Sequence, residues 1–223
     1  MKTVVLFDLD GTLLDTLPGL AASTNAALRA HGEPARTIDE VRAFVGNGVR
    51  RLIARAAEGG EGRPDYEALL GDFRAHYRAH ADEGTAPYPG VPELVAELRS
   101  RGVRLGVVTN KDEDVARSLV GRFFPGAFSV VVGGNAGRPP KPDPAMPAAA
   151  LAALGASAAE ALYVGDSEVD AATARRAGIP LRLCSWGFRP RGVLEPLGIV
   201  LDTPGEILAA VAAGVGAGAA PDR

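Results

Sequence analysis

Short apolar runs alternate along much of the chain with longer segments in which apolar residues recur every three or four positions. Residues 3–9 form the clearest short run and are rich in β-branched side chains, which is typical of a buried strand. Further strands are predicted at 103–109, 128–132, 161–165, 181–184 and 199–201, and helices at 91–101, 112–120, 144–154, 168–177 and 204–213. This alternation predicts an α/β fold with a parallel sheet covered by helices on both faces.

Residues 16–87 interrupt the alternation with a pattern that is helical throughout. Helices are predicted at 18–31, 38–44, 49–57 and 66–81, with no convincing strand between them. The sequence therefore predicts a core domain made from residues 1–15 and 88–213 and a helical domain at 16–87. The two crossings between them, at about 15–18 and 84–89, suit a hinge. Residues 214–223 are rich in Gly and Ala and are expected to form a disordered tail.

The overall composition excludes several classes of protein. The 223 residues carry 24 Lys and Arg against 27 Asp and Glu, and 47% are hydrophobic, which argues against disorder and against a basic nucleic-acid surface. Cys184 is alone, no apolar run approaches the roughly 20 residues that span a bilayer, and the first residues do not resemble a signal peptide. We therefore expect a cytoplasmic monomer or homodimer with no nucleic-acid or membrane partner.

The cationic residues are very unevenly divided, since 21 are Arg and only Lys2, Lys111 and Lys141 are Lys. A coding bias toward Arg explains most of this imbalance. A compact ammonium and a planar guanidinium are not interchangeable in a tight site, however, so the three lysines identify positions to inspect.

Polar residues gather after the predicted strands, at the edge where parallel sheets bind ligands. They are Asp8 and Asp10 after the first strand, Thr109, Asn110 and Lys111 after the second, Lys141 after the third, and Asp166, Ser167 and Asp170 after the fourth. Clustered carboxylates need a cation, and an oxygen-rich set without His or Cys favours Mg²⁺ over Zn²⁺. Together with an ammonium, a hydroxyl and an amide, such a site suits a phosphoryl group.

Several of these residues also have simpler explanations. An Asp at a strand end can form a turn or cap a helix, and Thr109 and Asn110 can cap the helix predicted to begin at 112. Asp170 can be a solvated helix residue, and Lys111 suits the surface nearly as well as the site.

Four motifs together resemble those of the haloacid dehalogenase superfamily of aspartate-nucleophile phosphatases. They are Asp8-Leu9-Asp10-Gly11-Thr12, Val108-Thr109-Asn110, Lys141-Pro142 and Gly165-Asp166-Ser167-Glu168-Val169-Asp170. The motifs occur in the family's order, and the resemblance covers about residues 3–213. It implies a Rossmann-like core with a helical cap inserted after the first motif.

The resemblance assigns catalytic roles to four residues. Asp8 is expected to be the nucleophile that forms an aspartyl-phosphate, and Asp10 the general acid and base. Lys141 is expected to offset the negative charge on Asp8 and on the phosphoryl oxygens, and Thr109 to donate to those oxygens.

The same resemblance implies a metal site and a binding site for the phosphoryl group. Mg²⁺ is expected on the Asp8 carboxylate, the Asp10 backbone carbonyl and Asp166, with Asp170 and Ser167 orienting the ligands. The residues expected to bind the substrate at this edge are Gly11, Thr12 and Asn110.

The substrate follows from more local resemblances. Asp10 favours phosphate esters over halides and phosphonates, because an alkoxide leaving group needs an acid. Phosphoglycolate phosphatases are similar at Gly46-Asn47-Gly48, Tyr88-Pro89-Gly90 and Thr109-Asn110-Lys111. The glycines would let backbone amides approach an anion, and Arg50 or Arg51 could pair with a substrate carboxylate.

A plain turn followed by solvated arginines also fits the Gly46–Gly48 segment. A small phosphate monoester, with 2-phosphoglycolate first, is the predicted substrate. A pyrophosphatase or a broad sugar-phosphate phosphatase remains the main alternative, and a phosphomutase or a non-catalytic binding relative is a further one.

Overall fold

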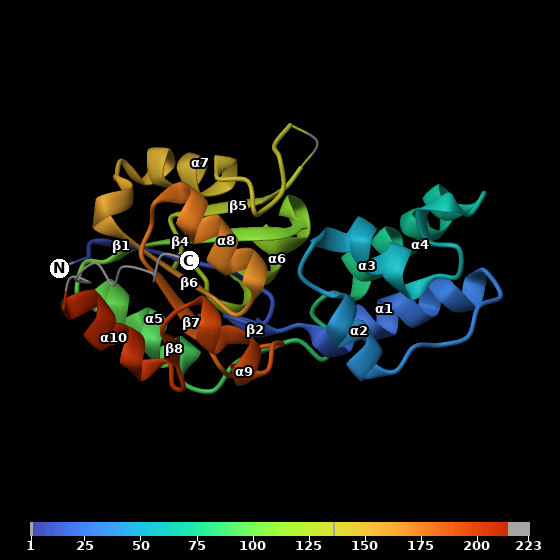
Figure 1. Cartoon of the computed structure of the whole chain (residues 1–223), viewed down its shortest axis with the longest axis horizontal. Coiled ribbons are helices and arrows are strands. Elements are labelled where there is room, and N and C mark those ends of the chain that lie inside the picture. Colours follow the sequence, from blue (N-terminus) through green and yellow to red (C-terminus); the bar gives the residue numbers. More distant parts are fainter. Residues whose placement is uncertain (1, 136, 214–223) are drawn as a thin grey trace.

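A six-stranded parallel sheet forms the centre of the computed structural model, which describes residues 2–135 and 137–213 (Figure 1). The strand order is β5-β4-β1-β6-β7-β8. The strands are β1 (Val4–Phe7), β4 (Arg104–Asp112), β5 (Val130–Gly134), β6 (Ala161–Gly165), β7 (Leu181–Cys184) and β8 (Val200–Leu201). Each neighbouring pair is parallel, which confirms the predicted sheet.

Helices cover both faces of the sheet, as the alternating pattern predicts. They are α5 (Val91–Ser100), α6 (Glu113–Phe123), α7 (Ala145–Leu154), α8 (Glu168–Ala177), the short α9 (Arg191–Leu194) and α10 (Gly205–Ala212). Val5 and Phe7 of β1 belong to one buried cluster with residues of α5, α6 and α10, whereas Val4 and Leu6 belong to a second cluster with residues of α7 and α8. Successive side chains of a buried strand thus fill opposite layers.

Four helices pack together beside the sheet, and residues 16–87 are called the cap below (Figure 1). The helices are α1 (Leu17–Ala30), α2 (Ile38–Phe44), α3 (Gly48–Ala56) and α4 (Tyr66–His80). A capping box starts α2, with Thr37 and Glu40 each satisfying a backbone N–H of the other. His31 joins the end of α1 to α4 through ion pairs of 2.7 Å to Asp65 and 2.9 Å to Asp72.

The chain crosses between sheet and cap twice, and the two crossings pair with each other. β2 (Leu14–Asp15) and β3 (Ala86–Pro87) form a two-stranded antiparallel sheet at the predicted hinge. The sequence pattern did not predict these strands, because two residues cannot display an alternation. The helix α9 was not predicted for the same reason, because it has only 4 residues. The predicted tail, 214–223, lies outside the described residues, and no helix in the described part is long and apolar enough to cross a membrane.

Candidate active site

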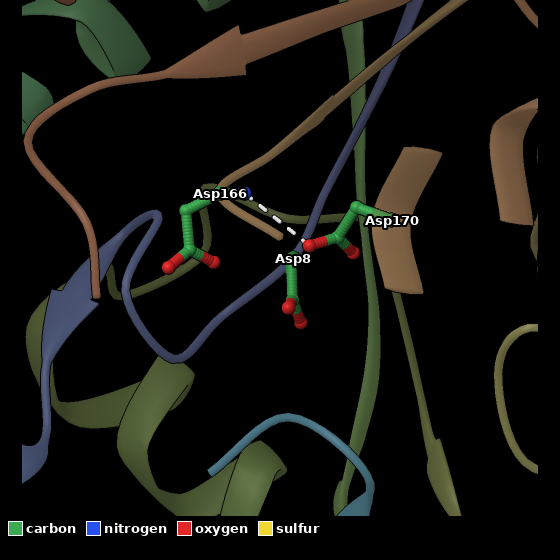
Figure 2. Close-up of side chains that lie close together, drawn as sticks. All are labelled: Asp8, Asp166 and Asp170. Carbon is green, nitrogen blue, oxygen red and sulfur yellow. Dashed lines mark hydrogen bonds between the residues drawn. The ribbon is translucent and has the colours of Figure 1, made fainter. Parts of the chain in front are cut away.

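Three carboxylates meet at the carboxyl edge of the sheet (Figure 2). Asp8 follows β1, Asp166 follows β6, and Asp170 lies in the first turn of α8. Because β1 and β6 are neighbours in register, their ends bring the side chains together, with one oxygen of each within 4.8 Å of the others. The three residues are nearly inaccessible, with exposed fractions of 9%, 2% and 0%.

This concentration of negative charge is unfavourable without a cation. Burial, followed by the charge of Asp170, raises the pKa of Asp8 to about 7. Burial likewise raises the pKa of Asp166 well above its ordinary value. A divalent cation would relieve both effects, and the all-oxygen donor set suits a hard metal ion. The Asp10 carbonyl stays a prediction as a ligand, because the cluster consists of side-chain oxygens.

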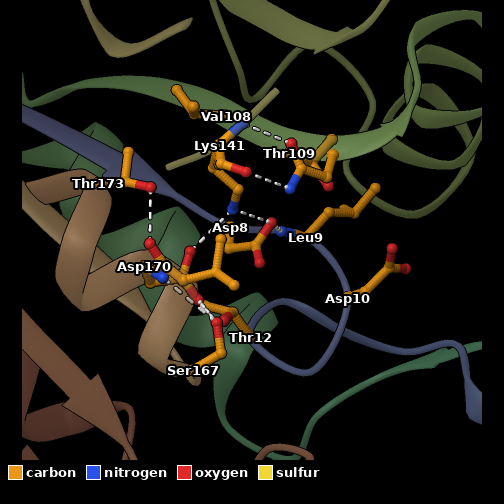
Figure 3. Close-up of polar contacts among 12 residues, drawn as sticks. Asp8, Leu9, Asp10, Thr12, Val108, Thr109, Lys141, Ser167, Asp170 and Thr173 are labelled. Atoms are coloured by element: carbon orange, nitrogen blue, oxygen red, sulfur yellow. Dashed lines mark hydrogen bonds and ion pairs between the residues drawn. The ribbon is translucent and has the colours of Figure 1, made fainter. Parts of the chain in front are cut away.

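Lys141 supplies one positive charge inside the carboxylate cluster (Figure 3). Its Nζ lies 3.0 Å from Oδ1 of Asp8 and 2.8 Å from Oδ1 of Asp170, and it donates to the hydroxyl of Tyr163 at 3.3 Å. Burial opposes the charged form, but Asp170 and Asp8 raise the pKa of Lys141 well above its usual value. The ammonium is therefore held charged beside the expected nucleophile.

Asp170 acts as a junction between this lysine and the following loop. Its second oxygen, Oδ2, accepts from the Ser167 hydroxyl at 2.5 Å and from the Asp166 backbone N–H at 3.2 Å. Ser167 also caps α8, since its oxygen accepts from the Asp170 N–H at 3.3 Å. Asp170 and Ser167 are thus placed to orient the loop that carries Asp166. The burial of Asp170 argues against its being a solvated helix residue.

Asp10 points away from the cluster into a different environment (Figure 3). Its Oδ1 accepts from the Thr16 hydroxyl at 2.6 Å and lies 2.8 Å from the ammonium of Lys111, which also donates to Oδ2 at 3.0 Å. The same ammonium donates to the hydroxyl of Tyr77 in α4 at 2.7 Å. Lys111 is 4% exposed, so the surface alternative for it is wrong.

Gly11 and Thr12 support Asp166. Gly11 has φ +81°, and a Cβ built there would lie 2.2 Å from Asp166 Oδ2, so the close approach requires glycine. The Thr12 hydroxyl donates to Asp166 Oδ1 at 3.4 Å, and the Phe188 N–H donates to Oδ2 at 2.8 Å.

A cavity of about 40 Å³ (the volume open to the centre of a water molecule) lies between the catalytic edge and the cap. Its core walls are Asp8, Asp10, Thr109, Asn110, Lys111, Asp166, Ser167, Phe188 and Arg189, and its cap walls are Leu20, Val45, Gly46, Gly48, Val49 and Leu52. The structure thus gathers most of the predicted catalytic residues and two predicted cap glycines around one space.

Asn110 reaches this cavity, but its amide already has partners. Nδ2 donates to the carbonyls of Gly46 at 3.3 Å and Lys141 at 3.1 Å, and Oδ1 accepts from the Lys141 N–H at 2.7 Å. Its side chain therefore fixes the Lys141 loop and touches the cap. Thr109 is buried beside it, and its hydroxyl oxygen accepts from the Lys111 N–H at 3.3 Å.

Other predicted cap residues lie away from the cavity. The Arg50 guanidinium forms hydrogen bonds of 2.8 and 3.0 Å with Glu67, and Arg51 pairs with Glu61. Asn47 lines a separate outer groove. Helical rotation explains this placement, because Val49 and Leu52 line the cavity and a residue between them points elsewhere.

Arg189 is the site residue that the sequence reasoning missed. It lines the cavity and forms hydrogen bonds with both the core and the cap. Its neighbour Phe188 also lines the cavity. One arginine among 21 carries no local signal of its position in space.

Known proteins share both the sequence and the architecture. A phosphoglycolate phosphatase of Rhodospirillum rubrum is 43% identical over 198 residues, covering 84% of this chain and 81% of that protein. One of Cereibacter sphaeroides is 40% identical over 195 residues, covering 86% and 88%. A solved structure described as a predicted phosphoglycolate phosphatase from Haemophilus somnus matches with a TM-score of 0.86 and 28% identity, covering 94% of this chain and 97% of that one.

The family model of the haloacid dehalogenase-like hydrolases matches residues 5–183, which include all four motifs and the cap. The structure places those motifs at a single edge of the sheet. The chain is a hydrolase that belongs to the haloacid dehalogenase-like family.

Proposed function

We propose that this protein is a Mg²⁺-dependent phosphatase that hydrolyses 2-phosphoglycolate to glycolate and phosphate. The observation that carries the proposal is the separation of Asp8 and Asp10. Asp8 lies with Lys141 in the carboxylate cluster, whereas Asp10 is bound by Lys111 and lines the same cavity. A reaction with one nucleophile and one acid needs such a division.

The proposed reaction has two steps. An Asp8 oxygen attacks phosphorus, the bond from phosphorus to the ester oxygen breaks, and Asp10 protonates the departing alkoxide. Asp10 then removes a proton from water, whose oxygen attacks phosphorus, and phosphate leaves as Asp8 is regenerated. Lys141 stabilises the charge near Asp8 in both steps, and the Thr109 hydroxyl, which lines the cavity, donates to a phosphoryl oxygen.

The carboxylates of Asp8 and Asp166 would hold Mg²⁺, with Asp170 fixing the loop around them. Bound there, the ion would neutralise negative charge shared by the nucleophile and the phosphoryl group. The oxygen donors and the raised pKa values of Asp8 and Asp166 support this placement.

The cavity offers a place for a second anionic group of the substrate. Leu20, Val49 and Leu52 supply apolar cap walls. Gly48 and Val49 also begin α3, and among the described residues the Asn47 side chain at the N-cap makes no capping hydrogen bond. The N-terminus of a helix attracts negative charge, so it replaces Arg50 as the proposed partner of the glycolate carboxylate. The names of the relatives support the same substrate.

A substrate panel tests the proposal. Phosphate release from 2-phosphoglycolate, pyrophosphate and glucose 6-phosphate is measured with Mg²⁺ and with chelator, and Asp8→Asn serves as the control for contaminating phosphatases. We expect metal-dependent turnover with phosphoglycolate as the best substrate. The absence of turnover for every compound would refute the proposed phosphatase activity. A strong preference for pyrophosphate or the hexose phosphate would refute only 2-phosphoglycolate as the substrate.

A further inference from the structure

One arginine of the core binds the backbone of the cap. Arg189 lies in the loop between β7 and α9, and its guanidinium is directed at both domains. Nε donates to Glu168 of the core at 3.1 Å, Nη1 to the carbonyl of Arg42 at 3.1 Å, and Nη2 to the carbonyl of Val45 at 2.6 Å. The side chain is only 15% exposed.

The two cap carbonyls lie at the C-terminal end of α2, which ends at Phe44 with Val45 as its cap residue. The final carbonyls of a helix lack partners within the helix and carry partial negative charge. A planar guanidinium can bind two of them at once, whereas an ammonium lacks this fork. Glu168 of the core accepts from Nε of the same guanidinium, and this bond orients Arg189.

The segment that follows α2, Val45–Gly48, is called the cap loop here, and Val45, Gly46 and Gly48 line the cavity. Gly46 has φ +124°, and a Cβ built there would lie 3.2 Å from Nη2 of Arg189. The next carbonyl, that of Gly46, accepts from Asn110 at 3.3 Å. Two core side chains therefore fasten consecutive carbonyls of the cap loop.

The same core segments hold the catalytic groups. Phe188, the neighbour of Arg189, donates its N–H to Asp166 at 2.8 Å, and Asn110 binds both backbone groups of Lys141. The cap loop is thus docked on the segments that position Asp166 and Lys141.

We propose that Arg189 is a positioning residue that fixes the cap loop over the catalytic edge, so that Gly46 and Gly48 meet the substrate in one defined position. The role in turnover rests on the proposed function, whereas the docking does not. In this proposal Arg189 acts through the backbone of the cap loop and not through direct contact with substrate.

Hydrogen exchange of residues 42–48 tests the docking without using activity. It is measured with Mg²⁺, with and without beryllium fluoride as a phosphate mimic, in the wild type, Arg189→Met and Arg189→Lys. Arg191→Met is the matched control, because Arg191 lies two residues away and pairs within the core with Glu195 and Asp202. We expect exchange to be at least tenfold faster in Arg189→Met, intermediate in Arg189→Lys and unchanged in the control.

Kinetics with two substrates relate the docking to turnover. Phosphoglycolate carries a carboxylate and methyl phosphate does not. If Arg189 positions the cap loop, Arg189→Met lowers kcat/KM about tenfold or more for phosphoglycolate, whose proposed carboxylate partner at Gly48 belongs to that loop, and Arg189→Lys recovers part of the loss. The loss for methyl phosphate is expected to be smaller. A normal kcat/KM of Arg189→Met for phosphoglycolate, despite faster exchange of the cap loop, would overturn the positioning role.

Unchanged exchange in Arg189→Met would also overturn the proposal, whatever the activity. If that variant fails to fold, Glu168→Gln loosens the anchor of Arg189 and is expected to give a smaller increase in the same segment. If the wild type is inactive but residues 42–48 still exchange faster in Arg189→Met than in the wild type, the proposed function is refuted and the docking stands.

Discussion

Replacing Lys141 by Arg keeps a positive charge but changes its shape. The ammonium lies 3.0 Å from Asp8 and 2.8 Å from Asp170, and the side chain is only 2% exposed. A guanidinium is larger and planar, and the close-packed surroundings leave no space for it without movement. The carboxylates on either side must therefore shift.

The size of the effect follows from that movement. Overpacking a buried site costs about 1–3 kcal/mol of stability. A displacement of about 1 Å at a reacting group lowers the rate by about 10²-fold, which corresponds to about 2.7 kcal/mol of barrier. We therefore expect Lys141→Arg to reduce kcat on phosphoglycolate about 100-fold, with a smaller change in KM.

The assay is steady-state phosphate release with saturating Mg²⁺, combined with thermal unfolding. Lys2→Arg is the matched control, because Lys2 is also buried, at 7% exposed, and donates to the Ala159 carbonyl away from the catalytic edge. It should lose stability and keep its activity. Turnover of Lys141→Arg within threefold of the wild type would refute the requirement for a compact charge.

Three further variants test the same site and the cap. Asp8→Asn should abolish phosphate release and keep cooperative unfolding; retained activity would exclude Asp8 as nucleophile. Because the pKa of Asp8 is raised to about 7, the metal-free folded state holds a proton that the unfolded state has lost, so unfolding free energy should fall from about pH 4 to 7 and fall less in this variant. Gly11→Ala should lower activity by about 10²-fold or more, since the added Cβ collides with Asp166; normal kinetics would contradict that reasoning. Hydrogen bonds that the His31 ring donates to Asp65 and Asp72 raise the pKa of His31. The stabilisation by these bonds is therefore complete below the unfolded pKa of about 6.5 and is lost as pH rises through the folded pKa. Urea titrations of the wild type and His31→Asn from pH 6 to 9 should converge at high pH, and a constant difference would exclude the ion pairs.

Elements with a strong local pattern were predictable in detail. The strands at 161–165 and 181–184 and the helices at 38–44 and 168–177 have the bounds that the sequence predicts. Each is a buried run or an amphipathic segment bounded by a turn or cap. The strand predicted at 103–109 continues to Asp112 in the structure. The prediction ended too early because the last residues of the strand contain the polar site motif and carry no strand pattern.

The site was predictable where strand ends dictate it and less so where the cap contributes. The carboxyl edge of a parallel sheet brings Asp8, Asp166 and Asp170 together, and this follows from the order of strands and helices. Proximity along a helix is a poor guide by comparison. Arg50 follows Gly48 by two residues and yet pairs with Glu67, while Arg189 arrives from a loop about 140 residues away.

The unequal division of lysine and arginine now has a physical explanation at two positions. Lys141 joins Asp8 to Asp170, and Lys111 joins Asp10 to the hydroxyl of Tyr77 in α4 of the cap. In each case one small ammonium fits between acceptors from different elements, where a guanidinium fork would force them apart. Asp8 and Asp10 are chemically identical and only two residues apart, so their different roles must come from their surroundings. Two buried lysines give each carboxylate its own partner, and Asp8 alone faces the other carboxylates that would hold a metal ion.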